Sequence, residues 1–269
     1  MLKRRFWHEN SIAQRYGKWN TATACTSRCE CREDARTESR WGGSAWNLPN
    51  FFSRWGERNQ VQPGGRRNRG MRVTMNRRAE LERRTNETTI TVGIDLDGSG
   101  RADVNTGIPF FDHMLSLFSV HGFFDLAVHA QGDIEVDSHH TVEDVGLVLG
   151  DAVEKALGDR KGIRRYGYAV TPMDEALATV VIDLSRRPYL VFQVPAGAAV
   201  ERSFNRSLAK EFFKSLSNRA GMNLHITVAY GENEHHILEA AFKSFGRALN
   251  QAVARDERIT GVRSSKGSL

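Results

Sequence analysis

Two segments of the chain show strand-like and helix-like patterns of apolar and polar residues in the same order. In the first segment, residues 88–95 alternate with a period of two, which is typical of a strand with one buried face. The Asp- and Gly-rich sequence at 97–100 predicts a turn into a second strand. A third strand is predicted at 126–130, and helices are predicted at 110–120 and 138–157.

The second half repeats the order strand, strand, helix, strand, helix. Such a repeat indicates an internal duplication, with pseudo-repeats at about 83–172 and 173–269. We therefore expect an α/β (α+β) fold built from two similar units, with Ser138 as the N-cap of one helix and Gly158 as its stop. The predicted elements of the second half are strands at 176–184, 189–194 and 224–229 and helices at 207–216 and 235–253.

Composition divides the chain near residue 75. Residues 1–74 contain 15 Lys and Arg against 6 Asp and Glu, whereas the remainder contains 23 against 26. All five Trp and all three Cys lie before residue 56, and eight of the nine His lie after residue 75. The basic charge therefore belongs to the first part and does not indicate nucleic-acid binding by the second. About 195 residues remain for the folded domain, which is ample for a core.

Residues 1–74 have no hydrophobic period, no apolar signal-peptide core and no membrane-spanning run. We interpret them as a disordered basic extension, with Met71 or Met75 as an alternative start. A transit peptide is disfavoured by the acidic residues, so the expected location is the cytoplasm, with a plastid only if the extension targets one. Cys25, Cys29 and Cys31 could suggest a metal knuckle, but no fourth ligand lies at a suitable spacing. The domain is predicted at 75–269, and it should fold and act without the extension.

A doubled histidine motif is the strongest chemical signal in the chain. His139-His140 is followed by Glu143, and His235-His236 is followed by Glu239 at the same distance. On a helix the first His and the Glu are four residues apart and share a face, whereas the second His is rotated by about 100°. One such pair is most often a polar helix start, but two copies in a repeated unit favour a paired-metal site. Imidazole and carboxylate without thiolate suit Mn, Fe, Co, Ni or Zn.

Other candidates are weaker. His113 precedes the first motif, and the duplication makes Glu211 its counterpart before the second. His129 is interpreted as structural. His225 could be a metal ligand, a hydrogen-bond partner of a ligand, or a residue whose hydrogen bonds serve only the local structure. The pairs Arg164-Arg165 and Arg186-Arg187 are more often surface charges, but with the C-terminal Ser264-Ser265-Lys266-Gly267 they could form a phosphate clamp.

These residues resemble the imidazoleglycerol-phosphate dehydratase family. The resemblance covers about 80–269, in a specific order of motifs, and excludes the extension. It rests on the sequences Arg84-Thr85-Asn86-Glu87-Thr88, Thr106-Gly107-Ile108-Pro109-Phe110-Phe111-Asp112-His113-Met114-Leu115, His121-Gly122, Asp137-Ser138-His139-His140-Thr141-Val142-Glu143-Asp144, Asp174-Glu175-Ala176, Asp183-Leu184-Ser185-Arg186-Arg187-Pro188, His235-His236-Ile237-Leu238-Glu239-Ala240 and Ser264-Ser265-Lys266-Gly267.

The resemblance implies a ribosomal-protein-S5-domain-2-like fold and a homo-oligomeric shell of 24 subunits, with no nucleic-acid or membrane partner. It also implies two Mn²⁺ ions per active site, with ligands from neighbouring subunits. One ion would take His113, His139, Glu143 and His236, and the other would take His140, Glu211, His235 and Glu239. Some relatives carry His at the position of Glu211, which changes the local charge.

The implied reaction is the loss of water from D-erythro-imidazole-glycerol phosphate, which gives imidazole-acetol phosphate in L-histidine biosynthesis. The metals would act as Lewis acids and as a template. Two other classes remain: a dinuclear metal-dependent hydrolase of a phosphorylated small molecule, and a non-catalytic metal-binding shell. The implied catalytic residues are Glu87, His139, Glu143, His235 and Glu239, and the implied substrate- and phosphate-binding residues are Glu87, His121, Arg165, Arg187, Ser265 and Lys266.

Overall fold

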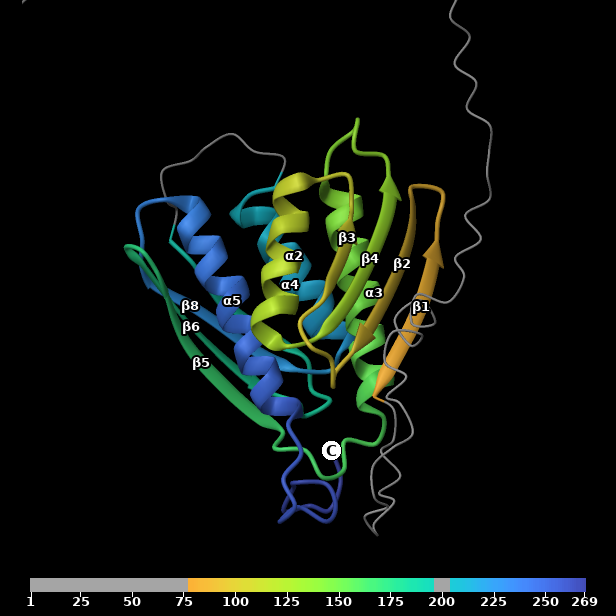
Figure 1. Ribbon diagram of the computed structural model, residues 1–269, viewed down its shortest axis with the longest axis vertical. Coiled ribbons are helices and arrows are strands. Elements are labelled where there is room, and N and C mark those ends of the chain that lie inside the picture. The colour runs from red at the N-terminus through yellow and green to blue at the C-terminus, as the bar shows by residue number, and fades with distance from the viewer. Residues whose placement is uncertain (1–76, 196–203) are drawn as a thin grey trace, which may run out of the picture. The chain divides into compact units, whose positions relative to one another are not determined.

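The computed structural model describes residues 77–195 and 204–269, so the predicted extension lies outside the described residues. Within this part the chain forms two four-stranded sheets and four long helices (Figure 1). None of these helices is long and apolar enough to cross a membrane. The first repeat consists of β1 (Arg78–Arg84), β2 (Thr88–Asp95), β3 (Ala102–Asn105), α2 (Pro109–Gly122), β4 (Asp125–Gly132) and α3 (His139–Leu157).

The second repeat has the same order of elements, which confirms the predicted duplicated α/β fold. The strand orders also correspond, as β1-β2-β4-β3 in one sheet and β5-β6-β8-β7 in the other. In each sheet the third strand of the repeat runs parallel to the fourth, and the other pairs are antiparallel. The elements are β5 (Tyr166–Met173), β6 (Ala176–Asp183), β7 (Tyr189–Gln193), α4 (Arg206–Arg219), β8 (Asn223–Tyr230) and α5 (Glu234–Val253).

The first strand of each repeat was not predicted. β1 reads Arg-Ala-Glu-Leu-Glu-Arg-Arg and buries little more than Ala79, because it forms an edge of its sheet. β5 contains Gly167 and Pro172, residues that are depleted in strands, although it too pairs along an edge. Since β5 belongs to the second sheet, the second repeat begins at Tyr166 rather than at the predicted residue 173.

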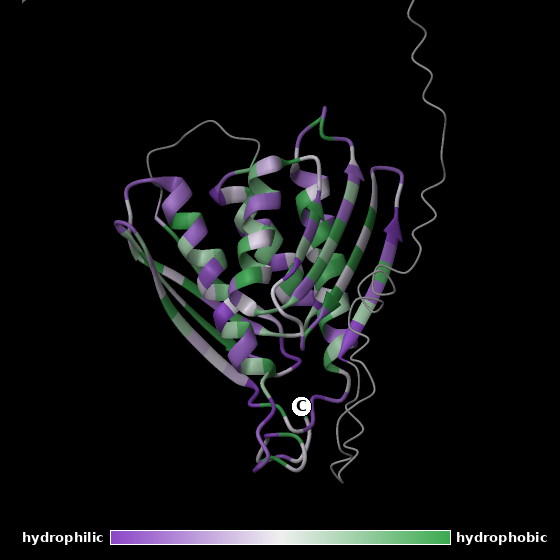
Figure 2. Ribbon diagram, viewed as in Figure 1, coloured by the Kyte–Doolittle hydropathy of each residue, from purple (hydrophilic) through white to green (hydrophobic). Residues whose placement is uncertain are grey.

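The helices form a layer between the two sheets (Figure 1). α3 packs on β1 and β2, and α5 packs on β5 and β6, so each sheet buries one face under the last helix of its own repeat. The two largest helix–helix contacts cross between repeats: α2 packs on α5, and α4 packs on α3. Apolar residues lie along the strands and on the facing sides of the helices, whereas the connecting turns are mostly hydrophilic (Figure 2).

Two glycines at equivalent positions allow these cross-repeat helix pairs to approach closely. A Cβ at Gly246 of α5 would lie 2.6 Å from the carbonyl oxygen of Phe118 in α2. At Gly150 of α3, a Cβ would lie 2.8 Å from the carbonyl oxygen of Leu216 in α4. Each glycine is eleven residues beyond the first His of its motif. Any larger side chain there would push the paired helices apart.

Candidate metal centre and anion pocket

The two His-His motifs lie at the N-terminal ends of α3 and α5. The loops before them fix the first turn, since Asp137 Oδ1 accepts a hydrogen bond from the His139 amide (2.7 Å) and Asn233 Oδ1 accepts one from the His235 amide (2.9 Å). Ser138 holds the predicted N-cap position but makes no side-chain capping bond. The helical spacing then sets each first His beside the Glu of its motif.

The predicted pairs four residues apart are confirmed. His139 Nε2 lies 3.4 Å from Glu143 Oε2, and His235 Nε2 lies 2.9 Å from Glu239 Oε2. The predicted divergence of the second histidines is also confirmed, because His140 contacts Asp133 and His236 contacts Glu175 instead of the Glu of the motif.

Each second histidine contacts a carboxylate that the sequence analysis did not pair with it. His140 Nδ1 lies 3.0 and 3.2 Å from the two carboxylate oxygens of Asp133, and this hydrogen bond raises the pKa of His140. His236 Nδ1 lies 2.6 Å from Glu175 Oε2. Both acids are on turns, where no periodic pattern indicates which side chain a residue will meet.

His113, His235 and Glu239 form a compact group that we call the histidine set. Their ligand atoms all lie within 4.8 Å of one another, and His113 Nε2 is 3.3 Å from the Glu239 oxygen that His235 also contacts. Burial alone would raise the pKa of Glu239, but hydrogen bonds from Lys243 and His235 lower it to about 2. Two imidazoles and an ionised carboxylate at this separation fit one divalent transition-metal ion.

This grouping, seen within one chain, differs from the division of ligands that the resemblance implied for ions shared between neighbouring subunits. His113 was expected to share an ion with His139 and Glu143, yet it lies in the set of His235 and Glu239. The cause is the cross-repeat packing, which brings α2 against α5. By the same packing Glu211 of α4 lies on the helix next to α3.

Lys214 supports this placement of Glu211. Its ammonium lies 3.0 Å from Glu211 Oε2, and both this bond and the charge of Glu143 raise the pKa of Lys214. The ammonium is therefore within electrostatic reach of both carboxylates. Within one chain, His113 thus lies beside the second motif, and Glu211 lies on the helix that packs against the first.

Glu87 occupies the turn between β1 and β2, immediately before β2. Thr85 Oγ1 accepts hydrogen bonds from the amides of Glu87 (3.1 Å) and Thr88 (2.9 Å), which fixes the turn. The Glu87 side chain is 56% exposed, and its Oε2 lies 3.9 Å from His140 Nδ1. The carboxylate is thus held at the edge of the His140 site and remains open to a ligand.

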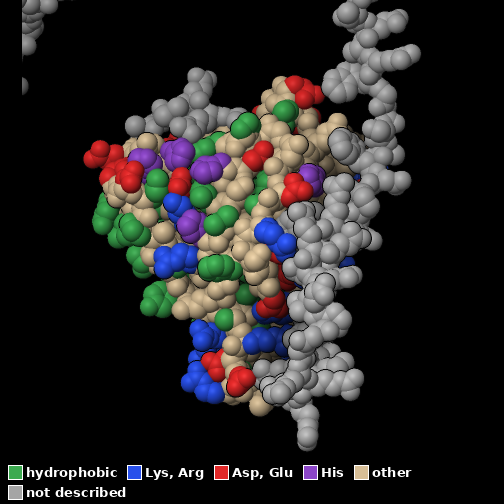
Figure 3. All heavy atoms as spheres, viewed as in Figure 1, with side chains coloured by type: hydrophobic (Ala, Val, Ile, Leu, Met, Phe, Trp, Pro, Cys, Tyr) green, Lys and Arg blue, Asp and Glu red, His purple; other side chains and the backbone are tan. Residues whose placement is uncertain are grey.

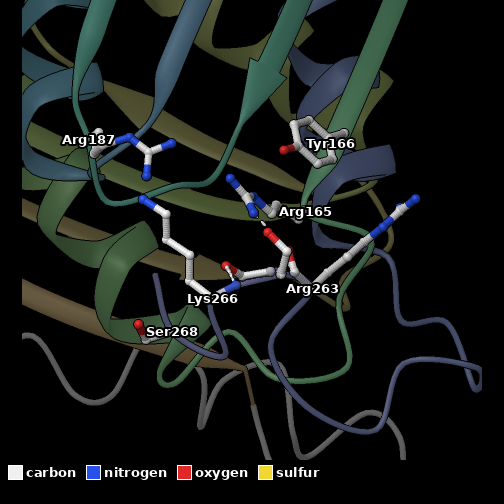
Figure 4. Close-up of a pocket in the computed structure, with 8 residues that line it drawn as sticks. Arg165, Tyr166, Arg187, Arg263, Lys266 and Ser268 are labelled. Carbon is white, nitrogen blue, oxygen red and sulfur yellow. Dashed lines mark hydrogen bonds between the residues drawn. The ribbon is translucent and has the colours of Figure 1, made fainter.

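A separate pocket of about 520 Å³ gathers positive charge (Figure 4). The predicted residues Arg165, Arg187, Ser265 and Lys266 all line it. The side chains of Arg187 and Lys266 point toward the same space (Figure 4). Their positive charges repel each other, and an anion bound between them would offset this repulsion. The additional lining residues are Tyr166, Arg263, Ser264 and Ser268.

Asp183 fixes Arg165 within this pocket. Its two oxygens accept from Arg165 Nε (2.6 Å) and Nη2 (3.0 Å), while Nη1 donates to the carbonyl oxygen of Arg263 (2.7 Å). No carboxylate in the described part of the chain pairs with Arg187 or Lys266 within 4 Å, so the pocket carries net positive charge. We call it the anion pocket.

His121 does not line the anion pocket, although it was assigned to the phosphate-binding set. It lies at the end of α2, where burial and the charges of Lys243 and Arg247 lower its pKa. His129 lies 3.6 Å from Asp103, and His225 is exposed on β8 between Val181 and Val191. Neither belongs to the histidine set.

The histidine set and the anion pocket lie at opposite ends of α5. His235 is in its first turn, whereas the amide of Arg165 donates to Ala252 at its last turn (2.9 Å). At 1.5 Å per residue the separation along the helix is about 25 Å. Histidines accordingly gather at the upper end of the face in Figure 3 and Lys and Arg at the lower end. A small substrate cannot span both sites of one chain.

The amino-acid sequence is similar to known proteins of one enzyme family. The family model described as imidazoleglycerol-phosphate dehydratase matches residues 106–249. The chain is 63% identical over 195 residues to the imidazoleglycerol-phosphate dehydratase of Desulfosudis oleivorans, covering 72% of this chain and 100% of that protein. It is 58% identical over 193 residues to the enzyme of that name from Syntrophobacter fumaroxidans, covering 72% and 98%.

Two solved structures share the fold. The imidazoleglycerol-phosphate dehydratase from Staphylococcus aureus superposes with a TM-score of 0.60 at 37% identity, over 66% of this chain and 99% of that one. The enzyme from Pyrococcus furiosus, in complex with (S)-C348, gives a TM-score of 0.63 at 38% identity, over 70% and 100%.

Proposed function

The chain belongs to the imidazoleglycerol-phosphate dehydratase family, the hydro-lyases of histidine biosynthesis, and from this premise we propose that two Mn²⁺ ions support its reaction. The substrate is then D-erythro-imidazole-glycerol phosphate, and the product is imidazole-acetol phosphate. The observation that supports metal dependence is the histidine set, in which three ligand atoms lie within 4.8 Å of one another.

The duplication provides two equivalent ligand groups. The histidine set would hold one ion, and His139, Glu143 and Glu211 would hold the other, since α3 and α4 pack as α2 and α5 do. The second histidine of each motif is turned away from its neighbour and would complete the group of a neighbouring subunit. When bound, the metal would supply Lewis-acid polarisation and a template for the substrate.

The remaining tasks belong to the side chains of this protein. Glu87, exposed beside His140, would take a proton from the glycerol carbons and return it. Lys243, 2.6 Å from Glu239 Oε1, keeps that carboxylate ionised and oriented. The anion pocket would hold the substrate phosphate, with Arg187 and Lys266 as its cations.

A complete site then requires neighbouring copies of the chain. Because the histidine set and the anion pocket of one chain are about 25 Å apart along α5, the phosphate must be held by a different copy from the one that holds the imidazole. This supports the homo-oligomer that the family resemblance implies, proposed here as a shell of 24 subunits.

An assay of both products tests the proposed reaction. The Mn²⁺-loaded oligomer should release imidazole-acetol phosphate from imidazole-glycerol phosphate without inorganic phosphate. Release of inorganic phosphate would support the hydrolase instead. Metal binding without any turnover would indicate a storage shell. Removal of the metal with a chelator should stop the reaction, and return of Mn²⁺ should restore it.

The anion pocket gives a separate prediction. Arg187→Ala should raise the KM about 10- to 100-fold, because a hydrogen bond to a charged group is worth about 1.5–3 kcal/mol. The affinity for Mn²⁺ should not change, since the pocket is at the other end of α5. Arg164→Ala removes the same charge from a side chain that faces Asp256 and does not line the pocket, so its KM should stay near the original value. Steady-state kinetics with both variants would show whether the pocket holds the phosphate.

A further inference from the structure

Each repeat places one glutamate in the same turn. Glu87 immediately precedes β2, and Glu175 immediately precedes β6. Each also faces the second histidine of its own repeat: Glu87 Oε2 is 3.9 Å from His140 Nδ1, and Glu175 Oε2 is 2.6 Å from His236 Nδ1. The two residues are therefore structural equivalents that arose from the duplication.

Their surroundings have diverged. Glu175 Oε1 accepts hydrogen bonds from the amides of Asn233 (2.8 Å) and Glu232 (3.1 Å), while its other oxygen contacts His236. Both oxygens of this carboxylate are therefore engaged by the protein itself and are not free to meet a substrate.

In the first repeat a different residue contacts the histidine. Asp133, in the loop between β4 and α3, approaches His140 Nδ1 with both oxygens, at 3.0 and 3.2 Å. Glu87 stays farther away and largely exposed. Asp133 thus does for His140 what Glu175 does for His236.

The position of the contact decides which nitrogen can bind a metal. A neutral imidazole has one N–H and one lone pair, and a carboxylate at Nδ1 stabilises the N–H there. In His140 and His236 the lone pair then lies on Nε2. The same ring atom of the first histidine in each motif faces Glu143 or Glu239. The remaining contact of His236 Nε2, with the exposed Asp174 at 3.6 Å, is long enough for an ion to replace it.

We propose that Asp133 and Glu175 are positioning residues that fix the Nδ1–H form of His140 and His236, so that each presents Nε2 to a metal ion. Because Asp133 has this role in the first repeat, the equivalent turn glutamate, Glu87, is released for proton transfer. The inference rests on the proposed metal dependence and adds to it which residues set the ligand geometry.

Mn²⁺ binding to the assembled protein, measured by titration calorimetry or by electron paramagnetic resonance of the unbound ion, tests this role. Loss of an outer carboxylate of a metal-bound His typically costs about 10- to 100-fold in metal affinity. We expect Glu175→Ala and Asp133→Ala to fall in that range. Glu175→Gln should weaken binding less than Glu175→Ala, because its amide oxygen still accepts from Nδ1. At saturating Mn²⁺ these variants should recover most of their kcat.

Matched controls remove one negative charge close to each proposed positioning residue. Glu135 is in the same loop as Asp133, and Glu232 is in the loop between β8 and α5, where its amide contacts Glu175. Both side chains are exposed, so Glu135→Gln and Glu232→Gln should bind Mn²⁺ normally. If the unaltered protein binds no Mn²⁺, the proposed function itself fails. If it binds Mn²⁺ and the Asp133 and Glu175 variants bind it equally well, the positioning role is overturned. Should Glu175→Ala not assemble, unchanged affinity in Asp133→Ala and in Glu175→Leu, which keeps the bulk but cannot accept from Nδ1, would overturn it.

Discussion

Replacing His235 with alanine should remove one Mn²⁺ per site and reduce turnover more than about a hundredfold, beyond what loss of an outer partner costs. His235 provides one of the three ligand atoms of the histidine set and also contacts the buried carboxylate of Glu239. Without the imidazole and the ion, Glu239 keeps Lys243 as its main partner. His139→Ala should have the same effect on the second group.

Metal content of the purified variant, by elemental analysis, and kcat at saturating substrate are the measurements. His129→Ala is the matched control, since this histidine pairs with Asp103 and should retain both metal and activity. Because the ligands are proposed to come from different subunits, metal loss should also loosen the assembly. A chelated sample that elutes as an intact shell would contradict this coupling while leaving the ligand assignment in place. Full metal content in His235→Ala would contradict the assignment.

Glu87→Gln should lower kcat by about 10²- to 10⁴-fold, the usual contribution of a positioned general acid or base. The amide keeps the size and hydrogen-bonding reach of the carboxylate but cannot take up a proton. KM and Mn²⁺ affinity should stay within a fewfold, because Asp133, and not Glu87, holds His140.

The control for this variant is Glu80→Gln, an exposed carboxylate on β1. It removes the same charge from the neighbouring strand and should leave kcat unchanged. A loss of Mn²⁺ binding in Glu87→Gln would assign Glu87 to the metal site. An unchanged kcat would move the proton-transfer role to another residue.

Local sequence patterns predicted the parts of the site that depend on local structure. The pairing of His235 with Glu239 follows from helical spacing alone, and the Asn233 cap shows why the helix begins there. The strands β1 and β5 were missed because they form sheet edges with charged residues or with Gly and Pro.

The partner of His113 could not be predicted in the same way. It depends on α2 packing against α5 across the two repeats, and nothing in either helix sequence alone specifies that contact. The family resemblance placed Arg165 and Lys266 together correctly, since the C-terminal segment folds back on the start of β5. It also assigned His121 to this group, whereas in one chain His121 lies beside Lys243 and Arg247.

Gly150 and Gly246 set how closely the helices that carry the two proposed ligand groups approach each other. His235 is eleven residues from Gly246, so about 16 Å of helix α5 separates this ligand from the close helix contact. A tilt of α5 by about 10°, within the ordinary scatter of helix crossing angles, would move the first turn of the helix, with His235, by about 3 Å. Metal–ligand distances tolerate only about 0.2 Å. The precision of the proposed metal centre would therefore depend on a contact three helical turns away, where the absence of a side chain lets two backbones touch.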